Sequence, residues 1–150
     1  MKKGQAAMEF LMTYGWALLV VLIAIAALAF FGVLNPSRFL PNSCSLAPGF
    51  SCVDFKASDA TDTITVVLQN GLGDTLSGVI LSLISAQGGC ASATFTPSNT
   101  QMLDGAQMTF SGSCTVTKGS KLKGDLILSY STSSGIAHSK VGLIVTGVEA

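Results

Sequence analysis

The sequence predicts an α+β protein in which a long N-terminal hydrophobic α-helix precedes an all-β domain. Residues 10–34 contain no charged side chain, and most of them are apolar. After Pro36 the composition changes to Ser, Thr and Gly, with short segments that alternate apolar and polar residues. All four cysteines follow the apolar run. At 150 residues, the chain has room for the helix and one domain of ordinary size.

The chain carries little charge. Eight basic and eight acidic residues cancel to a net charge of zero, and only 11% of all residues are charged. Because no acidic or basic tail stands out, we expect no nucleic-acid partner. The mean hydropathy of +0.58 is high for a soluble domain, and the apolar run accounts for most of the excess.

The apolar run predicts a membrane-spanning helix. About 20 helical residues cross roughly 30 Å of hydrocarbon, and this run has 25. Lys2 and Lys3 precede it, and the next basic residue is Arg38. Because Lys and Arg are retained on the cytoplasmic side, the amino terminus is expected inside and the following domain outside. Pro36 disfavours helix at the residue before it, so the helix is expected to end near Asn35.

The run does not fit an ordinary secretory signal. The apolar part of such a signal has about 7–15 residues, and its cleavage site comes afterwards. Here the small-x-small site at Ala24-Ile25-Ala26 lies inside the run. The remaining candidate cleavage site lies before the run, where Gly4 follows Lys2 and Lys3.

The segment Lys3-Gly4-Gln5-Ala6-Ala7-Met8-Glu9 resembles the class III signal peptide of archaeal type IV pilins and archaellins. The resemblance implies that a prepilin peptidase cuts between Gly4 and Gln5 and removes residues 1–4 as a leader peptide. It also implies that residues 5–35 remain on the mature protein as a filament-core and transmembrane helix.

The resemblance makes Glu9 the fifth mature residue, where the family places a glutamate. Gln5 matches the first mature residue of the common archaeal pattern. Ala7 stands where that pattern has a serine, and Thr13 stands where it has a leucine.

Two interpretations of Glu9 remain open. In the first, the carboxylate rests at the level of the lipid headgroups, one turn into the helix, where the helix dipole favours an anion. In the second, Glu9 is buried among helices, and cleavage after Gly4 creates its partner, the α-amine of Gln5. An unpaired buried charge is costly, so Gln5 and Glu9 would then set the register between subunits.

The alternating segments after Pro36 predict an immunoglobulin-like sandwich over residues 36–150. Short length, β-branched residues and Gly, Ser, Asn or Asp at the ends are typical of antiparallel strands. Gly71–Asp74 and Thr132–Gly135 are expected to be hairpin-like connections. The expected strands are 52–57, 63–69, 77–85, 93–96, 108–111, 114–117, 121–130 and 140–146.

The cysteines predict two disulfides formed outside the cytoplasm. Four cysteines allow three pairings, and the order along the chain favours Cys44 with Cys52 and Cys90 with Cys114. No CxxC is present and His138 is the only histidine, so neither a metal site nor any other cofactor is expected. Extracellular disulfides agree with the orientation that the lysines predict.

No enzyme motif is present. The sequence contains no GxxxxGK phosphate loop, no GxSxG elbow and no HExxH pair. With His138 as the one candidate base, the expected role is not catalytic.

We therefore predict a pilin, the structural subunit of an archaeal type IV pilus-like filament. Its helix would form the filament core, and its β-rich domain would face outwards for adhesion. Its partners would be other copies of itself in a helical homopolymer and the membrane before assembly. The resemblance adds the prepilin peptidase, a membrane assembly platform and an ATPase. Two alternatives are an archaellin of a motility filament and a monomeric, membrane-anchored, immunoglobulin-like binding protein.

Overall fold

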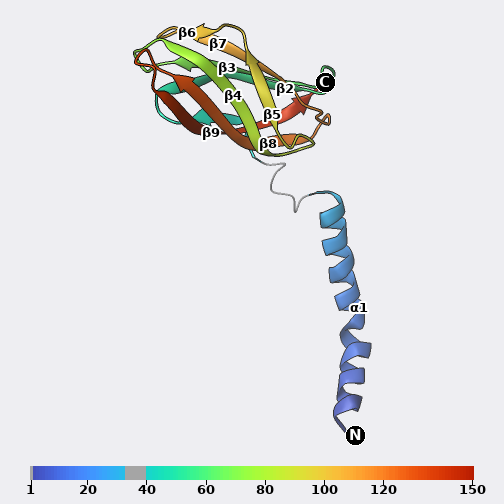
Figure 1. The fold of residues 1–150 in the computed structure, drawn as a ribbon. Helices are drawn as coiled ribbons and strands as arrows, with labels where there is room; N and C mark the ends of the chain where they lie inside the picture. Colours follow the sequence, from blue (N-terminus) through green and yellow to red (C-terminus); the bar gives the residue numbers. More distant parts are fainter. Residues whose placement is uncertain (1, 33–39) are drawn as a thin grey trace. The chain divides into compact units, whose positions relative to one another are not determined.

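The computed structural model describes residues 2–32 and 40–150 and divides the chain into two units, Met1–Phe39 and Leu40–Ala150. The first unit contains the helix and the second contains all the strands (Figure 1). The predicted fold class, one long helix followed by a β-domain, is confirmed.

Helix α1 extends over Lys2–Phe30. It begins three residues before the expected Gln5, because no proline or capping residue interrupts the pattern and Gly4 costs a helix only about 1 kcal/mol relative to alanine. It ends before the expected Asn35, which lies outside the described residues. Gly32 adopts a φ of 69°, and its N–H bonds to the carbonyl of Ala29. A glycine in this left-handed conformation is a common helix terminator.

Nine strands make up residues 40–150 (Figure 1). Most coincide with the expected segments, and four are three to six residues longer than expected. The strands are β1 (Ser43–Leu46), β2 (Phe50–Ser58), β3 (Thr63–Asn70), β4 (Leu76–Gln87), β5 (Ala93–Pro97), β6 (Gln101–Met102), β7 (Gln107–Ser113), β8 (Lys121–Ser131) and β9 (Ala137–Glu149).

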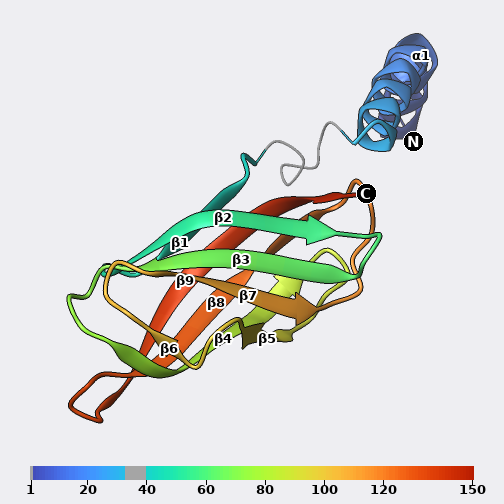
Figure 2. The same ribbon diagram turned by 90° about the horizontal axis from the view of Figure 1, so that it is seen from above.

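The strands form two layers that join along both sides. One layer contains β1, β9, β8 and β4, and the other contains β2, β3 and β7 (Figure 2). Strand β5 pairs with both β4 and β7, and β9 pairs with both β8 and β2, so the pairing closes on itself. The result is broadly immunoglobulin-like, and closure leaves few unpaired strand edges.

The core lies between the two layers and follows from strict alternation along the strands. In β3, Ile64, Val66 and Leu68 are fully buried, and the residues between them are partly exposed. In β8, Leu126 and Leu128 are fully buried in the same way. Side chains on alternate positions point to opposite faces of a strand, so this pattern buries one face of each layer.

One expected strand is wrong and two are missed. Residues 114–117 form no strand, because the pairing of β3 with β7 ends at Ser113 and the N–H of Cys114 instead bonds to the carbonyl of Asp62. Strands β1 and β6 were not expected. They have four and two residues, which is too short for an alternating pattern to show.

Candidate functional site: the apolar helix and the braced β-domain

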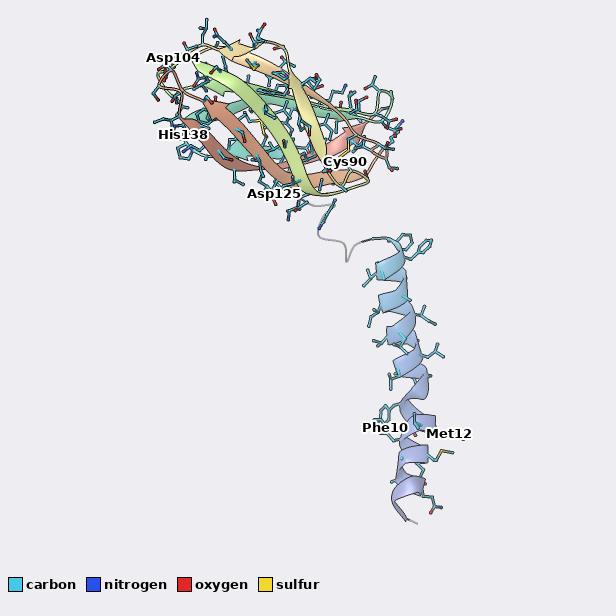
Figure 3. The ribbon with its side chains drawn as sticks, viewed as in Figure 1. Phe10, Met12, Cys90, Asp104, Asp125 and His138 are labelled. Carbon is cyan, nitrogen blue, oxygen red and sulfur yellow. A yellow bond between two sulfur atoms is a disulfide. The ribbon has the colours of Figure 1, made fainter. Side chains whose placement is uncertain are left out.

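Helix α1 presents apolar side chains on every side. Phe10 and Met12 project from opposite sides of the helix and are 59% and 84% exposed (Figure 3). Gly4–Phe30 is the one described helix long and apolar enough to cross a membrane, judged by its length and composition. A helix that is apolar all round needs a surrounding of lipid or of other helices.

The residues of the expected cleavage and register sites all lie on α1. Gly4, Gln5 and Glu9 are exposed. A Cβ atom placed on Gly4 would meet nothing within 4 Å. Among the residues whose side chains the structure describes, Glu9 forms no ion pair. The Thr13 hydroxyl donates a 2.9 Å hydrogen bond to the backbone carbonyl of Glu9. The hydroxyl therefore has a hydrogen-bond partner within the apolar helix.

The face of α1 beside Glu9 carries mostly small side chains. Spacings of three and four residues place side chains on one helix face. Six residues at spacings of three, four or seven form what we call the small-residue face: Ala6, Thr13, Ala17, Val20, Ala24 and Ala27. Glu9 is three residues after Ala6 and four before Thr13, so it lies on the same side of the helix as this face. Small residues let helix backbones approach closely in an apolar surrounding. The abundance of alanine was evident from the sequence, and the continuous helix aligns these residues.

Both expected disulfides are present in the β-domain. Cys44 and Cys52 join β1 to β2, with Cα atoms 5.9 Å apart. Cys90 precedes β5 and bonds to Cys114, which follows β7, with Cα atoms 5.6 Å apart. These are the pairs that the order along the chain favoured, and no described cysteine is free.

The 90–114 bridge is expected to be important for stability. Replacing Cys90 and Cys114 by alanine should lower the free energy of unfolding by about 3 kcal/mol, because the bridge closes a loop of 24 residues in the unfolded chain. Replacing Cys44 and Cys52 should cost less, since that loop has a separation of only 8. Chemical unfolding of the detergent-solubilised chain measures both. A larger loss for the 44–52 pair would contradict the loop-length argument.

The start of the β-domain is tied to β8 and β9. The ammonium of Lys121 donates a hydrogen bond to the carbonyl of Leu40. The side-chain oxygen of Asn42 accepts a 3.1 Å hydrogen bond from the N–H of Gly147. Together with β1 and its disulfide, these bonds fix the position at which the chain enters the domain.

Asp74 holds the turn between β8 and β9 through hydrogen bonds to Ser133. Its Oδ2 accepts hydrogen bonds from the hydroxyl and the N–H of Ser133, at 2.9 and 3.1 Å. Its Oδ1 accepts a third from the N–H of Thr75. The Ser133 hydroxyl is the largest cause and the Ser133 N–H the next. These bonds lower the pKa of Asp74 below its ordinary value, although burial opposes them.

The lowered pKa of Asp74 predicts a loss of stability in acid. A carboxyl whose pKa is lower in the folded state stabilises the fold above the unfolded pKa, near 3.8, and loses this contribution as the pH falls through the folded pKa. Asp74→Asn should therefore lower the melting temperature at pH 7, and its difference from the natural chain should shrink towards pH 2. Melting curves over this range test the prediction, with Asp59→Asn as the control. A difference independent of pH would contradict it.

No described cluster has the chemistry of an active site. His138, which is labelled in Figure 3, is exposed. Its ring stacks on that of Tyr130, with ring centroids 5.5 Å apart. In the part of the chain that the structure describes, no three His, Cys, Asp or Glu side chains are grouped closely enough to hold a metal ion.

A shallow hollow of about 430 Å³ lies between the loops around Gly49, Asn70 and Asp104. Asn70 is fully buried there, and its amide donates to the carbonyls of Asp74, Met102 and Leu103.

Comparisons with known proteins find similarity only among solved structures. No protein-family model matches the chain. No curated protein matches it either. One similar solved structure is the archaellum periplasmic stator protein complex of FlaF and FlaG from Sulfolobus acidocaldarius, with 9% sequence identity and a TM-score of 0.41. The match covers 65% of this chain and 90% of that one. A likeness at this identity and TM-score assigns no function to the chain.

Proposed function

We propose that the chain is a pilin, the structural subunit of an archaeal type IV pilus-like surface filament. The observation that carries the proposal is α1, which is apolar on every side and has one carboxylate, Glu9, near its start. In the precursor this helix would lie in the membrane. In the filament it would pack against the helices of other copies, with the β-domains on the outside.

The small-residue face supports direct transfer of α1 from lipid into a helix bundle. Lipid tails are as apolar as leucine, so the hydrophobic effect does not favour one surrounding over the other. Close packing of backbones has to supply the gain. Passing through water would cost about 0.8 kcal/mol per exposed CH₂, which is prohibitive for this helix. Assembly would therefore proceed from the membrane, on the platform and with the ATPase that the resemblance implies.

The disulfides support the placement of the β-domain outside the cell. Disulfides form and persist in oxidising compartments, and both bridges lie within residues 40–150. Lys2 and Lys3, at the start of α1 and ahead of its apolar part, would retain the amino terminus in the cytoplasm. The β-domain would then form the outer surface of the filament, where it can contact other cells or solid supports. The proposed role includes no catalysis and no cofactor.

Deletion of the gene in its native host tests the proposal. Electron microscopy of sheared surface material should show that one class of filament is lost and that it returns with the gene on a plasmid. Antibodies against the β-domain should decorate this filament along its whole length. Loss of swimming together with the filament would identify an archaellin instead. An unchanged set of filaments, with the antibody bound only to the cell envelope, would favour the membrane-anchored monomer.

A further inference from the structure

The outward face of strands β4, β8 and β9 is unusually apolar. Ile127 of β8 stands opposite Ser82 of β4 and Val141 of β9. Three more aliphatic residues surround it at the neighbouring outward positions. We call these five residues the outer apolar face: Ile80, Ile84, Ile127, Val141 and Leu143.

Four of these residues are exposed although they are aliphatic, and Ile127 is half-buried. Val141 is 60% exposed, Ile80 50%, Ile84 39% and Leu143 36%. Side chains opposite or diagonal to each other on neighbouring strands lie within contact range. The outer apolar face is therefore one patch on the sheet, on the side opposite the core residues Leu126 and Leu128.

The other layer of the same domain gives an internal comparison. The outward positions of β3 and β7 are nearly all Thr, Ser or Gln, as at Thr65, Thr109 and Ser111. Such a polar outward face is ordinary for an antiparallel sheet that is solvated on one side. An aliphatic outward face on only one layer indicates that this layer is covered in the working state of the protein.

A hollow continues the outer apolar face at one end. It has a volume of about 340 Å³, and Leu143 belongs both to its lining and to the face. Lys123 and Asp125 of β8 also line it, and Asp125 is marked in Figure 3. In the register Asp125 stands opposite both Ile84 and Leu143, so the face includes one carboxylate, and Lys123 lies at its edge. Protein interfaces likewise combine apolar surface with polar groups at the edge.

We propose that the outer apolar face binds the β-domain of a second copy of this chain. The proposal rests on the proposed function, because the face is too small to hold two copies together and a second contact between them is needed. It exposes on the order of 300 Å² of apolar surface, similar to the largest patches on monomeric proteins. A stable complex buries about 800 Å² on each partner. Two β-domains would not stay together through this face alone.

Packed α1 helices would supply the second attachment. Tethering two weakly binding surfaces makes their contact intramolecular and raises their effective concentration. A net charge of zero removes the general repulsion between like copies. In a helical filament each contact is heterologous, so the face of one copy meets a different surface of the next. The β-domains would then form a continuous outer layer.

Charge placed on the outer apolar face tests this proposal. Val141→Lys adds a lysine at the most exposed position of the face, and Val53→Lys is the matched control, because Val53 is 46% exposed on β2 of the other layer. We expect Val141→Lys to be cleaved after Gly4 and to form both disulfides, but to yield at least tenfold fewer sheared filaments than the natural chain. Val53→Lys should yield normal amounts.

The outcomes separate this proposal from the proposed function. Val141→Lys filaments at normal yield would overturn the role of the face and leave the pilin role intact. Equal losses for both variants would overturn the assignment to this face. An absence of filaments from the natural chain would overturn the proposed function itself.

A second measurement needs no variant. An amine-reactive reagent should modify Lys123, which lines the hollow, several times more slowly in assembled filaments than in detergent-dispersed chains. Lys118, which is exposed between β7 and β8, is the internal reference. Equal rates for Lys123 in both states would overturn the proposal, whether or not Val141→Lys folds.

Discussion

Replacing Glu9 by leucine is expected to leave membrane insertion intact and to reduce filament yield at least tenfold. The variant makes α1 more apolar, so the helix still enters the membrane. What it removes is the one carboxylate between Gln5 and Phe30. If Glu9 pairs with the α-amine of Gln5 of its own or a neighbouring chain, the leucine variant leaves that amine buried without a partner, which is strongly unfavourable.

Two further variants sharpen the test of Glu9. Glu9→Asp retains the charge and should assemble better than Glu9→Leu, although the shorter side chain weakens the pairing. Met8→Leu, one position away on the same exposed helix, should assemble normally. Yield is measured as filament protein sheared from cells, relative to the amount in membranes. Normal filaments from Glu9→Leu would leave the headgroup position as the better account of this carboxylate.

Replacing Gly4 by phenylalanine is expected to stop removal of the leader peptide. The structure separates this effect from damage to the helix, because a Cβ atom on Gly4 meets nothing within 4 Å. Any loss of processing then arises in the peptidase, whose site would have to accept the larger side chain. The precursor should accumulate in the membrane and keep residues 1–4, as gel mobility and mass show.

Gly4→Ala distinguishes two reasons for a glycine at this position. The expected cleavage bond lies inside α1, which begins at Lys2. Glycine weakens a helix by about 1 kcal/mol relative to alanine, and local unwinding there would present the bond in an extended form. Partial processing of Gly4→Ala would agree with this contribution from unwinding. Processing of Gly4→Phe at the normal rate would contradict the assigned cleavage site.

The helix could be predicted from the sequence because its signal is one of composition over many residues. An uncharged run of 25 residues has few alternatives to a helix in an apolar surrounding. Its ends were less certain. The stop at Phe30 depends on the backbone of Gly32, whereas the sequence offered Pro36 as the more obvious helix breaker.

The strands were predictable where alternation continues over several residues, as in β3 and β8. The same alternation did not reveal the outer apolar face. Ile80, Ile127 and Val141 come from three strands, and only the register places them together. The sequence alone does not place residues of different strands side by side, because it does not give the register between them. The hydrogen bonds of Asp74 to Ser133 likewise depend on two loops that are far apart along the chain.

The most direct test of the central claim is the intact mass and amino-terminal sequence of protein sheared from native cells. The account predicts a high-molecular-weight fraction whose subunits begin at Gln5 and have both disulfides. The mass also shows whether the α-amine of Gln5 is free to pair with Glu9, because cyclisation or methylation would change it. A chain that retains Lys2, Lys3 and Gly4 and is found only in membranes would contradict the filament role.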